Sequence, residues 1–80
     1  MRLPQLRAAE ILRLLERLGY QRVGPPGGHV KMRKLIKGKE HNITVPVHKG
    51  RDLPRWLMAQ ILKRVAEANN VTVQELSKLI

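Results

Sequence analysis

The feature that most constrains this chain is a pair of alternating segments on either side of a short turn. Hydrophobic and polar residues alternate in residues 29–35 and again in residues 42–47. The hydrophobic positions are Val30, Met32, Ile43, Val45 and Val47. A period of two is typical of β-strands with one buried face. Lys37-Gly38-Lys39-Glu40 supplies a turn between the segments, which therefore predict an antiparallel hairpin.

Side-chain parity limits the register of this hairpin. The hydrophobic residues of both strands share one face only where an even-numbered residue pairs with an odd-numbered one. A tight turn at Lys37-Gly38 places His29 opposite Pro46, whereas a looser turn places His29 opposite His48.

Helical patterns flank the hairpin on both sides. Residues 8–18 repeat hydrophobic residues at helical spacing, and Gly19 follows where a glycine commonly ends a helix. A second helix is predicted from about Pro54 to Ala68, with proline at its first position. Thr72-Val73-Gln74-Glu75 has the pattern of a capping box and predicts a short third helix over residues 73–80.

The remaining segment completes the predicted fold. Tyr20 to Val23 is a candidate short strand, and the glycines and prolines of residues 24–28 predict a loop. We expect one α+β domain over residues 1–80, in the order α-β-β-β-α with a short C-terminal helix. Its three-stranded antiparallel sheet is expected to carry the helices on one face and a polar surface on the other.

The charge of the chain points to a polyanionic partner. Sixteen Lys and Arg against six Asp and Glu give a formal net charge of +10. A folded domain of this size displays that charge on its surface, which favours nucleic acid. An acidic protein partner is the simpler alternative. Tyr20 and Trp56 are the only aromatic residues besides the histidines, which disfavours a platform for base stacking.

Several other classes of protein and site are disfavoured. The chain has no cysteine, which excludes disulfides and thiolate metal sites. No His-Glu-x-x-His motif or carboxylate cluster is present, so we expect no metal and no cofactor. No apolar run approaches the roughly 18 residues of a membrane span, and the N-terminal segment lacks the layout of a signal peptide. We therefore expect a cytoplasmic protein without a membrane partner.

The polar face of the hairpin carries the candidate functional residues. One histidine near a second one, surrounded by cations, could transfer protons during RNA cleavage without a metal. His29 is the candidate catalytic residue and His48 a possible second group. The candidate RNA-binding residues are Gly27, Gly28, Lys31, Arg33, Lys49 and Arg51, the two glycines through backbone N–H groups. There are two alternatives. In the first, His29 is an ordinary surface histidine and the chain is a non-catalytic RNA- or DNA-binding module. In the second, the chain is a protein-interaction domain with a basic face.

An ordered set of motifs resembles the HicA, or YcfA-like, family of bacterial toxin ribonucleases. The motifs are residues 11–20 (ILRLLERLGY), Gly27-Gly28-His29, residues 43–48 (ITVPVH), Asp52-Leu53-Pro54 and Ile61-Leu62-Lys63. The resemblance implies a fold like that of double-stranded-RNA-binding domains and metal-independent cleavage of messenger RNA. It also implies neutralisation by a HicB-type antitoxin.

The resemblance assigns the catalytic role to His29, because the family's Gly-Ser-His motif carries its catalytic histidine. The chain departs from that motif in having Gly28 in place of the serine. Pro25 and Pro26 also replace the polar or basic residues that usually precede the motif. These departures bear on rate and selectivity if the replaced residues contact RNA.

Overall fold

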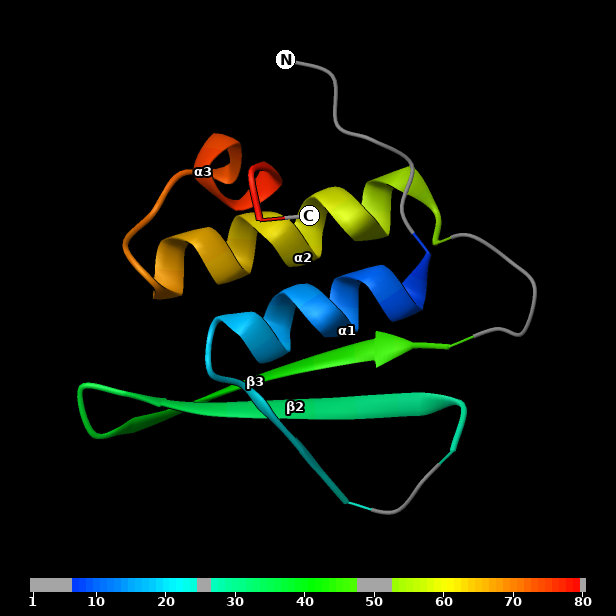
Figure 1. The fold of residues 1–80 in the computed structure, drawn as a ribbon. Coiled ribbons are helices and arrows are strands. Elements are labelled where there is room, and N and C mark those ends of the chain that lie inside the picture. The colour runs from blue at the N-terminus through cyan, green and yellow to red at the C-terminus, as the bar shows by residue number, and fades with distance from the viewer. Residues whose placement is uncertain (1–6, 25–26, 48–52, 80) are drawn as a thin grey trace.

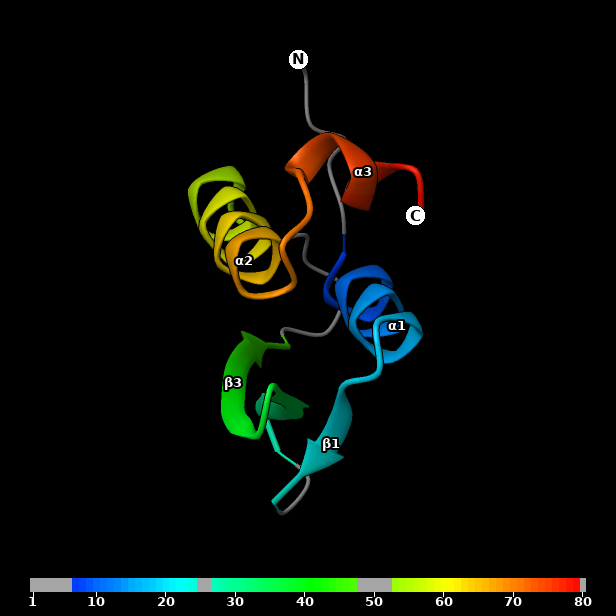
Figure 2. The ribbon, with the colours of Figure 1, turned by 90° about the vertical axis from the view of Figure 1, so that its left-hand side faces the viewer.

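The computed structural model describes residues 7–24, 27–47 and 53–79, and its elements follow the predicted order (Figure 1). They are α1 (Ala8–Arg17), β1 (Gln21–Val23), β2 (His29–Ile36), β3 (Lys39–Pro46), α2 (Arg55–Ala68) and α3 (Val73–Ser77). The strands form one antiparallel sheet in the order β1-β2-β3. Helices α1 and α2 lie on the same face of the sheet, and α3 lies beyond them, away from the strands (Figure 2). The predicted fold class is confirmed.

The hairpin of β2 and β3 adopts the register of the tight turn. Lys37 and Gly38 both have positive φ, at 51° and 80°, as a two-residue turn that matches the twist of the strands requires. His29 pairs with Pro46, so the looser register is wrong. The predicted four-residue turn is too long, because Lys39 and Glu40 already belong to β3.

Helix α1 ends through a glycine in the left-handed conformation, one residue earlier than predicted. Gly19 has φ of +99°, and its N–H donates to the carbonyl of Glu16 at 3.0 Å. The Tyr20 N–H donates to the carbonyl of Leu15 at 2.9 Å. These two bonds satisfy carbonyls that the helix leaves open and reverse the chain toward the sheet. The reversal buries the Tyr20 side chain, which is 2% exposed.

Helix α2 starts after Pro54 rather than on it. Pro54 has φ of −55° and ψ of 140°, which is extended backbone, so the prediction of a helical proline is wrong by one residue. At the other end Asn70 has φ of +56°, and the Val71 N–H donates to the carbonyl of Ala66 at 3.0 Å. Asparagine tolerates this left-handed conformation better than most residues, which explains why the helix ends there.

The predicted capping box of α3 is present. The Glu75 N–H donates to Oγ1 of Thr72 at 3.0 Å, and the Thr72 N–H donates to Oε1 of Glu75 at 3.2 Å. The helix ends at Ser77, earlier than predicted. Arg17 of α1 donates from Nη1 to the carbonyl of Leu79 at 2.8 Å, which fixes the residues after α3 against α1.

The core lies between the sheet and the helices. Met32, Ile43 and Val45 cover the inner face of the sheet, and each is at most 1% exposed. Leu76 of α3, also 1% exposed, closes the helical side. The other buried residues are Ala8, Ile11, Leu12, Leu14, Leu15, Tyr20, Leu53, Met58, Ile61, Leu62, Val65 and Ala66. Burial of each large side chain contributes roughly 1.5–3 kcal/mol, so this core positions the sheet firmly.

Candidate active site

His29 is the first residue of β2 and its side chain is exposed on the outer face of the sheet. The neighbouring Val30 packs against the core, and Met32 is fully buried. Because side chains alternate along a strand, His29 faces away from α1 and α2. Its partner across the hairpin is Pro46. The prediction that His29 faces solvent on the polar side of the hairpin is confirmed.

Lys31 and Arg33 continue the outer face of β2, as predicted. Both are exposed, and residues two apart on a strand are spaced by roughly 6.5–7 Å, so Lys31 is the nearer cation to His29. Arg33 is held by a carboxylate: its Nη1 lies 2.8 Å from Oε1 of Glu40, the diagonal residue on β3. Sequence reasoning missed this ion pair because it placed Glu40 in the turn.

Gly28 is fixed to the neighbouring strand through its carbonyl. That oxygen accepts a hydrogen bond from the Val47 N–H at 2.7 Å, which extends the β2–β3 pairing by one step. A Cβ built on Gly28 would lie 4.0 Å from the carbonyl oxygen of Val47, an ordinary van der Waals distance. A serine would therefore fit at this position, and the glycine is not required by space.

Several predicted residues lie outside the described ranges. They are His48, Lys49 and Arg51, together with Pro25 and Pro26. The described part of the candidate site therefore consists of Gly27, Gly28, His29, Lys31 and Arg33.

A second polar cluster, which sequence reasoning missed, lies on the inner face of the sheet toward the hairpin turn. It consists of Tyr20, Lys34, His41 and Asn69, and we refer to it as the tyrosine cluster. Nζ of Lys34 donates to Oδ1 of Asn69 at 2.5 Å, and Nδ2 of Asn69 donates to the Tyr20 hydroxyl at 3.1 Å. The hydroxyl oxygen lies 2.7 Å from Nδ1 of His41.

The directions of the two bonds made by Asn69 follow from the donors and acceptors present. Lys34 has only donors, so Oδ1 of Asn69 accepts and its Nδ2 must donate to Tyr20. The Tyr20 oxygen therefore accepts from Asn69, and it has both a second lone pair and its own proton to offer Nδ1 of His41. A histidine that accepts at Nδ1 is neutral and carries its proton on Nε2.

The pKa values of the cluster shift in the directions that burial requires. Burial lowers the pKa of His41, and the positive charges of Arg64 and Lys34 lower it further. Burial also raises the pKa of Tyr20, outweighing the hydrogen bond from Asn69 and the charge of Arg64. Both groups are therefore neutral near pH 7.

One sequence signal could have revealed this cluster. Lys34 lies two residues after Met32 on β2, and His41 lies two residues before Ile43 on β3. Side chains two residues apart on a strand share a face, so Lys34 and His41 must face the helices. A polar residue on an apolar face needs a partner. The partner residues could not be identified, because Tyr20 and Asn69 come from segments distant in the sequence.

Comparison with known proteins identifies the family. A family model described as the HicA toxin of bacterial toxin-antitoxin matches residues 8–66, which run from α1 through the whole sheet and most of α2. The chain belongs to the HicA toxin family. The resemblance drawn from its motifs is confirmed, and with it the role of a toxin whose family pairs with an antitoxin. No curated protein and no solved structure matches this HicA chain.

Two kinds of feature are absent from the described ranges of this HicA chain. Residues 7–24, 27–47 and 53–79 contain no group of three or more His, Cys, Asp or Glu side chains placed to hold a metal ion. In the same part of the chain, no helix has the length and apolar character needed to span a membrane.

Proposed function

We propose that this HicA toxin is an endoribonuclease that cleaves messenger RNA without a metal, with His29 as a general acid or base. The observation that carries this proposal is the exposed His29 on the same sheet face as Lys31 and Arg33. An imidazole has an ordinary pKa of about 6.5, so it can accept or donate a proton near neutral pH. The family assignment supports the proposal, because the resemblance to HicA toxins implies cleavage of messenger RNA without a metal.

The proposed reaction uses the 2′-hydroxyl of RNA as the nucleophile. One group removes the hydroxyl proton as the oxygen attacks the adjacent phosphorus, and a second group protonates the departing 5′-oxygen. The products are a 2′,3′-cyclic phosphate and a free 5′-hydroxyl. His29 performs one of the two proton transfers, and we propose His48 for the other.

The cations and glycines around His29 have a separate role in this proposal. Lys31 and Arg33 stabilise the negative charge on the phosphoryl oxygens, and N–H groups of Gly27 and Gly28 add hydrogen bonds. Lys49 and Arg51 bind neighbouring phosphates. None of these groups needs to change its protonation state during the reaction.

The test incubates the purified protein with single-stranded RNA in excess EDTA. We expect cleavage to continue under chelation and to fall by about 10²–10⁴-fold in His29→Gln. Gln60→Ala, an exposed change on α2, is the control and should cut normally. Cleavage that persists in His29→Gln would remove His29 from the mechanism, and loss of cleavage on chelation would indicate a metal. RNA with a 2′-deoxy sugar at the cut should resist cleavage.

A non-catalytic RNA- or DNA-binding module is the second candidate. It is favoured by Gly28, which stands where the family motif has serine. This alternative predicts that His29→Gln binds as tightly as the wild type and that neither protein cuts RNA. Both candidates require affinity to fall steeply with salt, because phosphate contacts release counterions. A flat salt response would contradict both.

We further propose that a HicB-type antitoxin neutralises this toxin and that both act in the cytoplasm, where messenger RNA is found. Inducing the wild type should arrest growth, and inducing His29→Ala should not. Co-expression of an antitoxin from a neighbouring reading frame should restore growth. Arrest by His29→Ala equal to that of the wild type would indicate toxicity by another route.

A further inference from the structure

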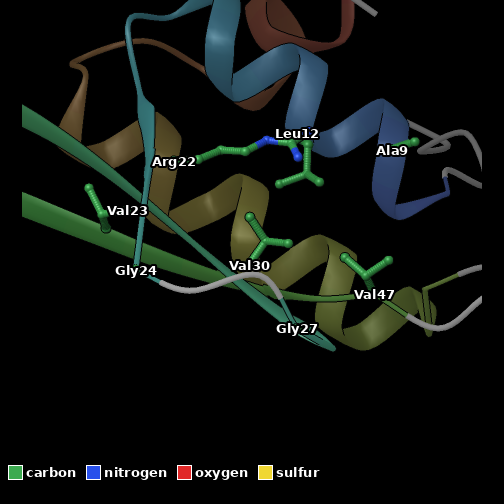
Figure 3. Close-up of a pocket in the computed structure, with 8 residues that line it drawn as sticks. All are labelled: Ala9, Leu12, Arg22, Val23, Gly24, Gly27, Val30 and Val47. Carbon is green, nitrogen blue, oxygen red and sulfur yellow. The ribbon is translucent and has the colours of Figure 1, made fainter.

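A cavity of about 520 Å³ opens between α1 and the end of the sheet that carries His29 (Figure 3). Apolar side chains from α1, β2 and the end of β3 form most of its wall, and one charged side chain, Arg22, extends toward α1 along it (Figure 3). Its lining residues are Ala9, Leu12, Arg22, Val23, Gly24, Gly27, Val30 and Val47. A volume in this range is typical of sites for small molecules and cofactors.

The cavity adjoins the candidate active site through the chain itself. Gly27 and Val30, which flank His29 in the sequence, both line it. Pairing of β1 with β2 stops at Val23 and Lys31, so no β1 residue pairs beside His29. The cavity and the His29 side chain therefore lie on opposite faces of the same strand end. Both features therefore belong to one strand end, and the proposed function places a phosphate of the RNA there.

The chemistry of the lining suits a nucleobase. Aliphatic side chains such as Leu12, Val30 and Val47 can contact the flat apolar faces of a base, as side chains do in pockets that hold extruded bases. The guanidinium of Arg22 offers donors in one plane, which match the acceptors on a base edge. Its Nη2 lies 3.7 Å from Oε1 of Glu16, and both side chains are more than half exposed, so this ion pair is weak enough to yield.

We propose that this cavity binds one base of the RNA, next to the phosphate held at His29, and so determines where the toxin cuts. The position of the phosphate rests on the proposed nuclease function. A base is favoured over an apolar side chain of a protein because Arg22 brings positive charge to the cavity. The chain also carries sixteen Lys and Arg against six acidic residues, which attracts the phosphates on either side of the base.

The first test fills the cavity. Ala9 is an exposed position on α1, so Ala9→Leu adds bulk to the cavity wall at a site that tolerates leucine. Ala59→Leu makes the same change at an exposed position of α2 and serves as the control. Each protein cuts a pool of RNA with random sequence, and the bases beside the cuts are counted. We expect the wild type and Ala59→Leu to share a preference, and Ala9→Leu to lose it by about tenfold.

A second pair of variants tests the polar side of the cavity and does not depend on how Ala9→Leu folds. Arg22→Met keeps an apolar stem and removes the donors to the base edge. Glu16→Gln breaks the same ion pair but leaves Arg22 in place. We expect Arg22→Met to change the preferred base and Glu16→Gln to retain it. An unchanged preference in both Arg22→Met and Ala9→Leu would overturn the proposal.

A binding measurement separates this proposal from the nuclease proposal. Methyl NMR of the wild type is recorded with an RNA oligonucleotide that has 2′-deoxy sugars throughout its centre and cannot be cut there. Methyl signals of Leu12, Val30 and Val47 should shift, whereas Leu62, buried on α2, should not. Such shifts support the binding of a base in the cavity even if the wild-type protein cuts no RNA. Binding without these shifts, or shifts produced only by an antitoxin, would overturn it even if His29 proves catalytic.

Discussion

Replacing Tyr20 with phenylalanine tests the tyrosine cluster, which joins the sheet to the end of α2. The change removes one hydroxyl from a residue that is 2% exposed. That hydroxyl takes part in two hydrogen bonds, at 2.7 Å with His41 and at 3.1 Å with Asn69. Each bond contributes a net of about 0.5–1.5 kcal/mol, so we expect the free energy of unfolding to fall by about 1–3 kcal/mol.

The loss should be visible as a shift in melting temperature. A domain of this size loses roughly 4–8 °C for each kcal/mol, so Tm should fall by about 4–24 °C. Urea unfolding near neutral pH should give the same loss with an unchanged m-value. Thr44→Val, which removes an exposed hydroxyl from the outer face of β3, is the control and should change stability by at most about 0.5 kcal/mol.

The same variant makes a second, independent prediction for His41. In the tautomer that carries its proton on Nε2, the neutral ring loses a donor at Nδ1, so the pKa of His41 should rise relative to the wild type, as an NMR titration of the ring protons would show. A Tyr20→Phe protein that melts at the wild-type temperature and leaves the His41 titration unchanged would show that the Tyr20 hydroxyl does not donate to His41.

Three further predictions follow from described contacts. The folded pKa of His41 lies below its unfolded value of about 6.5. The contribution of His41 to stability is therefore present above pH 6.5 and is lost as the pH falls through the folded pKa. Urea midpoints should fall over this pH range, and the fall should be smaller in His41→Gln. Lys37→Asn creates an Asn-Gly turn at a position where the backbone has positive φ. The free energy of unfolding should rise by about 0.5–1 kcal/mol in urea titrations. An unchanged free energy of unfolding would contradict the turn assignment. Glu40→Gln releases Arg33 from its ion pair, so RNA affinity should rise and the slope of log affinity against log salt should steepen by about 0.7. Glu67→Gln makes the same charge change on α2 and is the control. An equal effect of Glu67→Gln would show that only the net charge of the protein matters.

The sequence predicted the backbone of the fold because its signals were local. The alternation of hydrophobic and polar residues showed which side chains share a face of the hairpin. The short turn at Lys37-Gly38 selected the observed register. Gly19 and the capping box at Thr72 marked helix ends correctly, since each acts within a few residues. Errors were confined to boundaries, such as Pro54, where one residue separates an extended conformation from a helical one.

The candidate site was predicted less completely, because side-chain pairing depends on residues far apart in the chain. Parity placed His29, Lys31 and Arg33 on one exposed face, and the structure confirms that placement. It could not show that Arg33 is paired with Glu40, since the pairing depends on where β3 begins. The tyrosine cluster escaped notice for the same reason, and the catalytic role of His29 stays a prediction.

The end of α2 has a consequence for how the domain is delimited. The segment that matches the family stops at residue 66, yet Asn69, which holds Lys34 and Tyr20, lies beyond it. Leu76 also lies beyond it and is 1% exposed, with α3 packed over α1 and α2. A fragment cut at the family boundary would expose apolar surface and release the anchor of the hairpin. The physical unit of this toxin therefore extends through α3, and engineered versions should retain it.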